Sequence, residues 1–333
     1  MTAANNSPQP PQPFELVSLP QHQPQRSMPT GHDTYWGLSG RIALKLHAKT
    51  NTVVASGVVA MGDDISERYK DIPLLKVALQ RDKTQIVPGS SLKGVVRSAY
   101  EAITSSCLCK VQKKHQRKIP QGYKECRICR QNSELCPSCR LFGAMGYQGK
   151  ISFYDAIPTQ DSSDANFFPN LFSPQTNKNK YYRQNVLAGR KFYYPTDRAA
   201  KSFNGGGIHA QQAQQGTVFE TTIDFTNLDK AELGTLMIVL GRDSEHPIAL
   251  KAGGGKPVGF GSLLPEPQQI DWLTDRYLSY DAESNPLQGE ALETYVSRAI
   301  ETAKEELVQG HQLQELSQIL GWPTNRHPPE GAY

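Results

Sequence analysis

The chain has 333 residues, of which 38% are hydrophobic, enough to bury the core of one large domain or two. Its net charge of +4 excludes a polybasic tail protein, so any contact with nucleic acid must come from local clusters of cations. No apolar run approaches the roughly 20 residues of a transmembrane helix. Residues 1–33 are rich in Pro and Gln without the apolar core of a secretory signal, and we expect a disordered tail on a cytoplasmic protein.

A strand is predicted at residues 41–48, and a long loop is predicted at residues 57–86. Apolar and polar residues alternate through 41–48, as they do in a half-buried strand. Residues 57–86 are punctuated by glycine and are too long for a tight connection, which predicts an extended functional loop.

A helix is predicted after Pro88, with Ser90 or Ser91 as its N-cap. Lys93 and Arg97 lie four residues apart on one face, and the other face carries the apolar stripe Leu92, Val95, Val96, Ala99, Tyr100 and Ile103. Free N–H groups, two serines and two cations together suit a phosphate backbone. An ordinary surface helix with two solvated cations is the alternative.

All six cysteines lie within residues 107–139, which indicates a metal site rather than a disulfide framework. Two C-x-x-C knuckles complete a tetrahedral site, and we expect a structural zinc on Cys126, Cys129, Cys136 and Cys139. Cys107 and Cys109 are substitutes or a second site, and His115 can replace a thiolate. Free buried thiols and an iron–sulfur cluster are the alternatives. The zinc would hold a run of lysines and arginines that either contacts RNA or is merely solvated.

Further elements are predicted in this order: a strand at 151–154, a loop at 161–180, a strand at 218–225, a helix at 229–241, a strand at 257–264 and a helical segment at 290–319. Asp229 and Glu232 form a capping box for the second helix. The order strand, helix, strand, strand, helix, strand is that of a ferredoxin-like (RRM-type) α+β fold. We therefore expect a main domain at 34–266, with a zinc-binding insertion at 106–140 and a C-terminal helical extension at 267–333.

Four segments resemble, in order, the motifs of the RAMP superfamily of CRISPR-associated proteins. They are P-G-S-S-L-K-G with V-V-R-S at 88–98, L-F-G with G-K-I-S-F-Y-D at 141–155, G-R-K-F-Y-Y at 189–194 and G-G-G-K-P-V-G-F-G-S at 253–262. The resemblance implies a RAMP fold and a backbone-type (Cas seven-like) subunit of a type III effector complex. The implied partners are guide crRNA, complementary target RNA, and other RAMP and large subunits, without a membrane.

The resemblance also implies a candidate for cleavage chemistry. In RAMP backbone subunits that cut target RNA, the loop before the signature helix carries an Asp in a D-x-P context, and Asp71-Ile72-Pro73 matches it. Asp71 with a divalent cation (Mg²⁺ or Mn²⁺) would then help a 2′-OH attack the adjacent phosphate. Asp63 and Asp64 compete for this role, but their Gly-Asp context favours a turn. The nearby cations that would meet developing charge are Arg68, Lys70 and Lys76.

The residues expected to bind RNA are Ser90, Ser91, Lys93, Arg97, Arg190, Lys191, Tyr193 and Lys256. Cations beside aromatic rings bind phosphates and stack bases. The glycine loop before Lys256 lacks the P-loop spacing, which argues against nucleotide hydrolysis. Two functions follow: a crRNA-binding subunit that is also an endoribonuclease within the assembled complex, or a non-catalytic structural RAMP subunit that only binds RNA.

Overall fold

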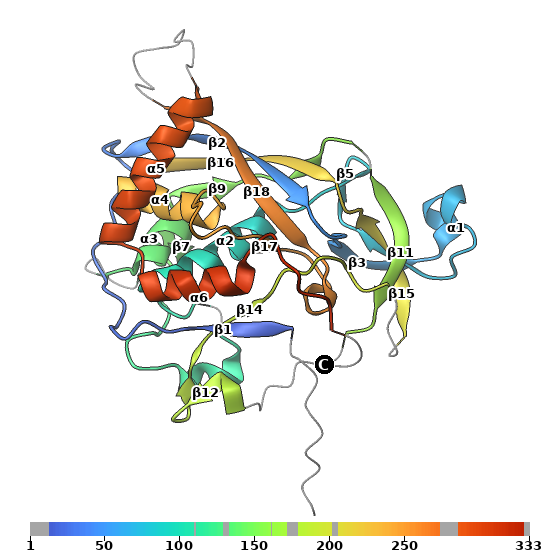
Figure 1. Ribbon diagram of the computed structural model, residues 1–333, viewed down its shortest axis with the longest axis horizontal. Coiled ribbons are helices and arrows are strands. Elements are labelled where there is room, and N and C mark those ends of the chain that lie inside the picture. The colour runs from blue at the N-terminus through green and yellow to red at the C-terminus, as the bar shows by residue number, and fades with distance from the viewer. Residues whose placement is uncertain are drawn as a thin grey trace, which may run out of the picture.

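The computed structural model describes residues 13–109, 111–128, 133–160, 162–171, 179–201, 206–273 and 286–329. The fold is mixed α/β, with a curled antiparallel sheet at its centre and helices gathered against one face of that sheet (Figure 1). A second, smaller sheet forms an arm that projects from the opposite end of the molecule.

The central sheet has the spatial strand order β10 (Ile157–Pro158), β16 (Val218–Leu228), β2 (Leu38–Ala48), β18 (Ser262–Trp272), β17 (Leu250–Lys251). Two further strands join it antiparallel: β9 (Ile151–Phe153) on β16 and β19 (Leu287–Gln288) on β18. The strands predicted at 41–48, 151–154 and 218–225 are confirmed. On β2, Ile42, Leu44 and Leu46 point into the core, as the alternation of the sequence predicts.

The helices against the sheet are α2 (Gly89–Ile103), α4 (Lys230–Val239), α5 (Gly289–Glu306) and α6 (Gly310–Leu320). The capping box of α4 is confirmed, because Glu232 N donates to Asp229 Oδ1 at 2.7 Å and Asp229 N donates to Glu232 Oε2. Helix α5 crosses α4 closely at Gly234, where a Cβ atom would lie 1.9 Å from the Ala299 carbonyl oxygen. The segment predicted at 290–319 is thus two helices rather than one.

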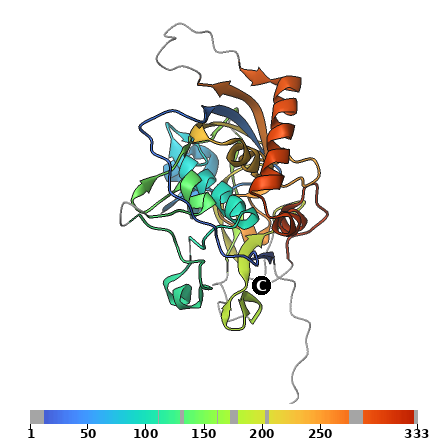
Figure 2. The ribbon, with the colours of Figure 1, turned by 90° about the vertical axis from the view of Figure 1, so that its left-hand side faces the viewer.

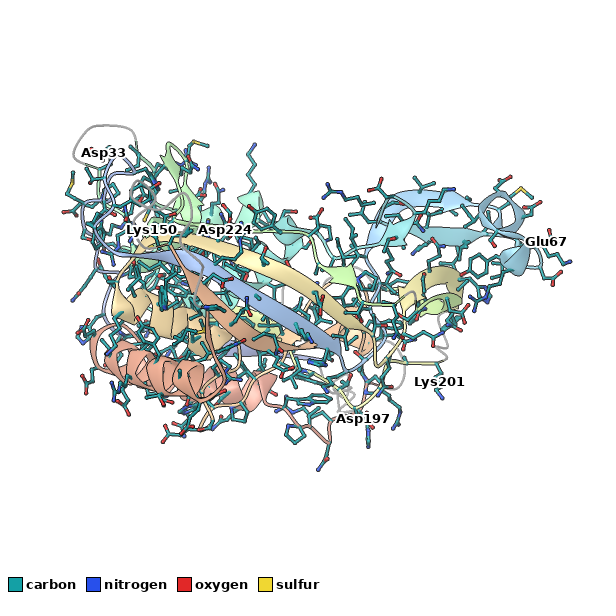
Figure 3. The ribbon with its side chains drawn as sticks, turned by 90° about the horizontal axis from the view of Figure 1, so that it is seen from above. Asp33, Glu67, Lys150, Asp197, Lys201 and Asp224 are labelled. Carbon is teal, nitrogen blue, oxygen red and sulfur yellow. The ribbon has the colours of Figure 1, made fainter. Side chains whose placement is uncertain are left out.

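The arm corrects two sequence predictions. Its sheet has the order β11 (Ser163–Pro169), β15 (Gly207–Ala213), β4 (Leu75–Ala78), β3 (Ala55–Ala60), and its tip carries α1 (Gly62–Ile65) and η1 (Glu67–Tyr69), near the labelled Glu67 in Figure 3. Residues 57–86 and 161–180 were expected to be loops. The pairing of β15 with β4 joins segments that are far apart in the sequence, so no local pattern reveals it.

Part of the expected tail is ordered, and one expected domain boundary falls within a strand. Residues 14–18, placed in the disordered tail, form β1 (Phe14–Ser18), which pairs with β14 (Gly189–Tyr193) and buries Val17. The boundary expected at 266 lies inside β18, and the helices beyond it belong to the main core through Leu292 and Leu316. Residues 1–12 of the expected tail lie outside the described ranges.

The remaining elements are short. They are the pairs β5 (Gln80–Arg81) with β6 (Thr84–Gln85), β7 (Gly143–Ala144) with β8 (Tyr147–Gln148), and β12 (Tyr182–Arg183) with β13 (Val186–Leu187), and the helices η2 (Lys113–Lys118), α3 (Pro137–Phe142), η3 (Asn179–Tyr181) and η4 (Lys256–Val258). None of the described helices is both long and apolar enough to span a lipid bilayer.

Candidate nucleic-acid interface and metal centre

The outer face of the central sheet is poorly suited to a phosphate backbone. Basic side chains on β2 face carboxylates on the neighbouring strands: Arg41 lies 2.6 Å from Asp224, Lys45 lies 3.7 Å from Glu220, and His47 lies 2.5 Å from Glu266. These cross-strand pairs stabilise the sheet and neutralise its cations. A polyanion gains little from a cation that already has a carboxylate partner.

Helix α2 begins differently from the sequence prediction. Its N-cap is Pro88, and the Gly89 N–H donates to Asp155 Oδ1 at 2.9 Å. Ser90 and Ser91, the predicted N-caps, therefore lie within the first turn and are exposed. A carboxylate from another motif segment already occupies part of the helix N-terminus, which leaves less of it for a phosphate.

The exposed face of α2 is lined by small residues. Ser91, Gly94 and Ser98 are exposed, whereas the apolar stripe packs into the core. A Cβ atom at Gly94 would meet nothing within 4 Å, so no neighbour requires glycine there. Glycine in a helix interior costs about 1 kcal/mol relative to alanine. Gly94 therefore leaves the helix surface without a side chain at this position, although an alanine would stabilise the helix.

A groove runs along this face of α2. It consists of two cavities of about 560 and 470 Å³ that share Gly94, Ser98, Lys191 and Phe192 in their walls. The larger cavity extends to the glycine loop at 253–256, and the smaller one ends between the cysteine-rich segment and the β12–β13 hairpin. We call the whole feature the α2 groove, walled by Ser91, Gly94 and Ser98 on α2 and by Lys191, Phe192 and Tyr193 on β14.

The two predicted cations of α2 donate into the protein. Lys93 Nζ donates to the Ile151 carbonyl oxygen at 2.8 Å, and burial, followed by the charge of Arg97, lowers the pKa of Lys93. Arg97 donates from Nε to Glu101 Oε1 at 2.8 Å and from Nη2 to Cys139 Sγ at 3.3 Å. The geometry gives both side chains a structural role, and their contact with RNA stays a prediction.

The cations of β14 point to opposite sides, as successive strand residues do. Arg190 is buried and donates from Nη2 to the carbonyl oxygens of Ser106 and Cys107, at 2.7 and 3.1 Å. Lys191 is half-buried, lines the groove and donates to the hydroxyl of Tyr193 at 2.8 Å. Of the two, Lys191 is the one that faces a ligand in the groove.

A second buried lysine, which the sequence analysis missed, lies beside Lys256. Lys256 Nζ donates to the Gly253 carbonyl oxygen at 2.6 Å, and Lys251 Nζ donates to Ser262 Oγ at 3.1 Å. Lys251 is only 6% exposed. Burial lowers the pKa of both, and that of Lys251 is lowered further by Lys256.

Within the described ranges, neither Lys251 nor Lys256 forms an ion pair with a carboxylate. Both line the same end of the α2 groove. Two lysine amino groups buried near each other without a carboxylate partner favour an anionic ligand, because an anion stabilises their protonated forms. The only sequence signal for Lys251 was its position just before the glycine loop.

Four buried cysteines gather in the insertion: Cys107, Cys126, Cys136 and Cys139, with their sulfur atoms all within 4.8 Å of one another. The sulfurs of Cys107 and Cys139 are 3.6 Å apart. Tetrahedral zinc with bonds of about 2.3 Å places its sulfurs roughly 3.8 Å apart. The group can therefore hold a metal such as zinc. It contains three of the four expected ligands and one expected substitute, Cys107, and Cys129 lies outside the described residues.

The surroundings of the cysteine group separate the other candidates from it. Cys109 Sγ lies 3.5 Å from Glu125 Oε1, and His115 Nδ1 lies 2.8 Å from the hydroxyl of Tyr182, so neither belongs to the group of four. Zinc with four thiolates carries a net charge of about −2, and Arg97 supplies a cation next to it.

Asp71 is exposed and follows η1, whose Glu67 is labelled at the tip of the arm in Figure 3, far from α2 in Figure 1. The Gly62 N–H donates to the Ile72 carbonyl oxygen at 3.0 Å, which closes this tip into a compact turn. Asp63 and Asp64 lie in the first turn of α1 rather than in the predicted turn, because acidic side chains stabilise a helix N-terminus.

The cations near Asp71 in the sequence have partners elsewhere. Arg68 pairs with Asp164 at 3.0 Å, and Lys70 pairs with Glu67 at 2.9 Å. Lys76 Nζ lies over the ring of Phe168, 5.0 Å from its centroid, and forms a cation–π interaction with it. The arm therefore presents Asp71 as an exposed carboxylate, while these three cations have other partners.

Comparison with known families adds one finding. The model of the RAMP superfamily matches residues 45–263, more than half of the chain and the range that contains all four motif segments. No curated protein matches the chain.

Proposed function

The chain belongs to the RAMP superfamily, and from that membership we propose that it is a backbone-type (Cas seven-like) subunit of a type III CRISPR effector complex. Membership in this superfamily indicates a CRISPR-associated RNA-binding subunit. In the proposed function, the subunit holds guide crRNA and the target RNA paired with it. Base pairing then reads the target sequence while the protein holds the backbone.

We assign the central sheet and its first two helices to a ferredoxin-like core. The elements follow the chain order β2, α2, β9, β16, α4, β18, which is strand, helix, strand, strand, helix, strand. In space the strands lie in the order β9, β16, β2, β18, all antiparallel. This arrangement supports the assignment and leaves the exposed face of α2 as the surface over which RNA passes.

The observation that carries RNA binding is the α2 groove. Gly94 places no side chain in the groove, and no neighbouring residue requires glycine at this position. Lys251 and Lys256 place two lysine side chains, neither paired with a carboxylate of the described residues, at one end, and Lys191 lies in the shared wall. A polyanionic strand that needs close approach to a helix fits this combination.

Equilibrium binding of single-stranded RNA by the purified protein tests this proposal. Lys256→Ala should weaken binding of unrelated sequences alike and reduce the slope of log K against log salt by roughly one. Lys45→Ala is the matched control, because Lys45 lies on the ion-paired outer face of the sheet. Unchanged affinity and salt slope in Lys256→Ala would remove the groove from the RNA path.

The proposed function includes cleavage of target RNA at Asp71. The 2′-OH gives up its proton to solvent as its oxygen attacks the adjacent phosphorus, and the bond from phosphorus to the 5′-oxygen breaks. The leaving 5′-oxygen takes a proton from solvent, so the products are a 2′,3′-cyclic phosphate and a 5′-hydroxyl. A divalent cation, Mg²⁺ or Mn²⁺, supplies charge stabilisation at the phosphate when bound. Asp71 supports this role as an exposed carboxylate at the arm tip, free of ion pairs with the described residues.

Cleavage is tested in the assembled complex with guide and target RNA. Asp71→Ala should leave assembly and target pairing intact, because an exposed loop carboxylate contributes little to folding. Cleavage at the site facing this subunit should fall by orders of magnitude, and EDTA should reproduce the loss. Asp63→Ala and Asp64→Ala are the controls and should cut nearly as well as the parent.

The second candidate function is a structural RAMP subunit without chemistry. It is favoured by the engagement of Arg68 and Lys70 in other ion pairs, which leaves Asp71 without a local cation for the transition state. A complex carrying Asp71→Ala that still cuts at every site assigns the chain to this second function.

A further inference from the structure

One end of the α2 groove has a character that phosphate binding does not explain. This cavity, of about 470 Å³, lies between the cysteine-rich insertion and the β12–β13 hairpin. Both elements project from the same side of the molecule, and they meet where Tyr182 contacts His115 (Figure 2). We propose that this hairpin cavity takes one unstacked RNA base. The inference rests on the proposed function and names a ligand for part of the same groove.

The walls of the hairpin cavity are mostly apolar, and their apolar residues come from three parts of the chain that are far apart in the sequence. They are Leu16 of β1, Leu108 and Val111 of the insertion, Tyr181, Tyr182 and Leu187 around the hairpin, and Phe192 of β14. An apolar wall repels a solvated phosphate but favours the flat faces of a base. The volume falls within the range of ordinary small-ligand pockets, about 300–1,000 Å³.

The aromatic side chains at the cavity are held in place before any ligand arrives. The ring of Tyr181 stacks on Phe14 with centroids 5.5 Å apart and planes at 6°. The hydroxyl of Tyr182 lies 2.8 Å from His115 Nδ1, and Lys118 Nζ lies 4.0 Å from the centroid of the Tyr182 ring. Little conformational entropy is therefore lost when a base enters, because these side chains are already ordered.

The cavity also has polar groups in its wall. Glu101 Oε1 accepts hydrogen bonds from Arg97 Nε and Ser138 Oγ, whereas Oε2 accepts none from the described residues. The pairing edge of every RNA base carries an N–H group that a carboxylate oxygen can accept. Lys191 lies in the wall shared with the rest of the groove, where it can meet the phosphate of the same nucleotide.

Nearby positive charges and the connection of the cavity to the rest of the α2 groove favour an RNA base over a protein side chain as the occupant. Lys118, Arg183 and Lys191 place cations on or beside the hairpin. The cavity opens directly into the α2 groove, so a strand lying along Gly94 reaches it without leaving the protein surface. A neutral apolar peptide gains nothing from these cations, whereas an RNA strand gains from both the cations and the cavity.

The test is a walk of single abasic sites along a short single-stranded RNA. Removing a base leaves the phosphates intact, so the loss of affinity measures the base alone. One position should lose about tenfold in affinity relative to its neighbours, the lower part of the range for base–aromatic contacts. The salt slope should stay the same at every position, because no phosphate contact is lost.

Two substitutions in β13 test whether that effect arises in the hairpin cavity. Leu187→Trp fills the hairpin cavity and should abolish the difference between intact and abasic RNA at the sensitive position. Val186→Trp is the matched control, since Val186 is exposed on β13 and does not line the cavity. If Leu187→Trp lowers the melting temperature or the zinc content, Tyr182→Ala carries the same test, with Tyr182→Phe as its control.

The outcomes separate this inference from the proposed function. A parent protein that does not bind RNA overturns the proposed function. A parent that binds RNA with equal losses at all abasic positions overturns the base cavity alone. The same follows if Leu187→Trp and Val186→Trp behave alike, since the sensitive base would then lie elsewhere.

Discussion

The cysteine-rich insertion and the arm both leave the central sheet, but the protein holds them in opposite ways. The insertion closes on its own buried cysteine group, and Arg97 and Arg190 donate hydrogen bonds into it from α2 and β14. The arm is attached by strand pairing and exposes large apolar side chains near its tip, among them Val58, Met61 and Leu74. The insertion is therefore a fixed wall of the α2 groove, whereas the arm leaves apolar side chains exposed to solvent.

The largest expected effect is loss of the metal from the insertion. Cys136→Ser should reduce the zinc content from about one per chain to near zero and lower the melting temperature, because the insertion has no other core of its own. Elemental analysis and thermal unfolding measure both. Cys109→Ser is the control and should retain the metal, since Cys109 contacts Glu125 outside the group of four.

The same measurement decides the ligand set. Cys107→Ser should lose zinc as Cys136→Ser does, because Cys107 completes the buried group. Cys129→Ser should retain zinc, because four thiolates already close a tetrahedral site. Retention by Cys107→Ser with loss by Cys129→Ser would restore the two-knuckle set expected from the sequence.

A smaller effect is expected from Arg97, the link between α2 and the cysteine group. Arg97→Ala should weaken zinc retention by about 10- to 100-fold, as loss of a supporting partner of a metal ligand does. Competition with a chelator measures this retention. Arg68→Ala removes an ion pair of the arm instead and should leave zinc retention unchanged. Equal behaviour of the two variants would mean that the insertion is held no more firmly than the arm.

The pH dependence of RNA binding should reflect the loss of charge from Lys256 at the end of the groove. Burial lowers the pKa of Lys256, so its charge is lost at a lower pH than that of an exposed lysine. Affinity should therefore fall as the pH is raised, before exposed lysines lose their protons near about pH 10, and it should fall by less in Lys256→Arg, because arginine stays charged. Fluorescence anisotropy at constant ionic strength measures this difference, and parallel curves would contradict it.

The smallest effect compares two glycines with open space around them. A Cβ atom meets nothing within 4 Å at Gly94 on α2 or at Gly57 on the arm, but Gly57 has φ of +92°. Gly94→Ala should stabilise the fold by up to about 1 kcal/mol, and Gly57→Ala should destabilise it by a similar amount. Denaturant unfolding measures both changes.

A larger side chain at the same position separates stability from binding. Gly94→Phe should weaken RNA binding severalfold without lowering the melting temperature, because the ring enters the groove and displaces no neighbour. RNA affinity unchanged in Gly94→Phe would mean that the strand does not pass over α2.

The elements that the sequence predicted correctly are those with a local physical signal. The alternation in β2 and β16 marks strands with one buried face, and the capping box of Asp229 and Glu232 marks the start of α4. The strands of the arm were missed because their pairing is long-range, as in the parallel contact of β15 with β4. Two cysteine knuckles predicted a metal site, but the place of Cys107 in it needed the fold.

For the candidate groove, the sequence alone determined which residue types are available, and the tertiary structure decided which of them face a ligand. Lys93, Arg97, Lys191 and Lys256 look alike in the sequence, yet Arg97 donates to the cysteine group while Lys191 lines the groove. Lys251 carried no sequence signal beyond its position before the glycine loop, and only the fold shows that β17 buries it beside Lys256. The physical reason is that periodicity and spacing report local geometry, whereas the partner of a charge depends on which distant backbone lies next to it.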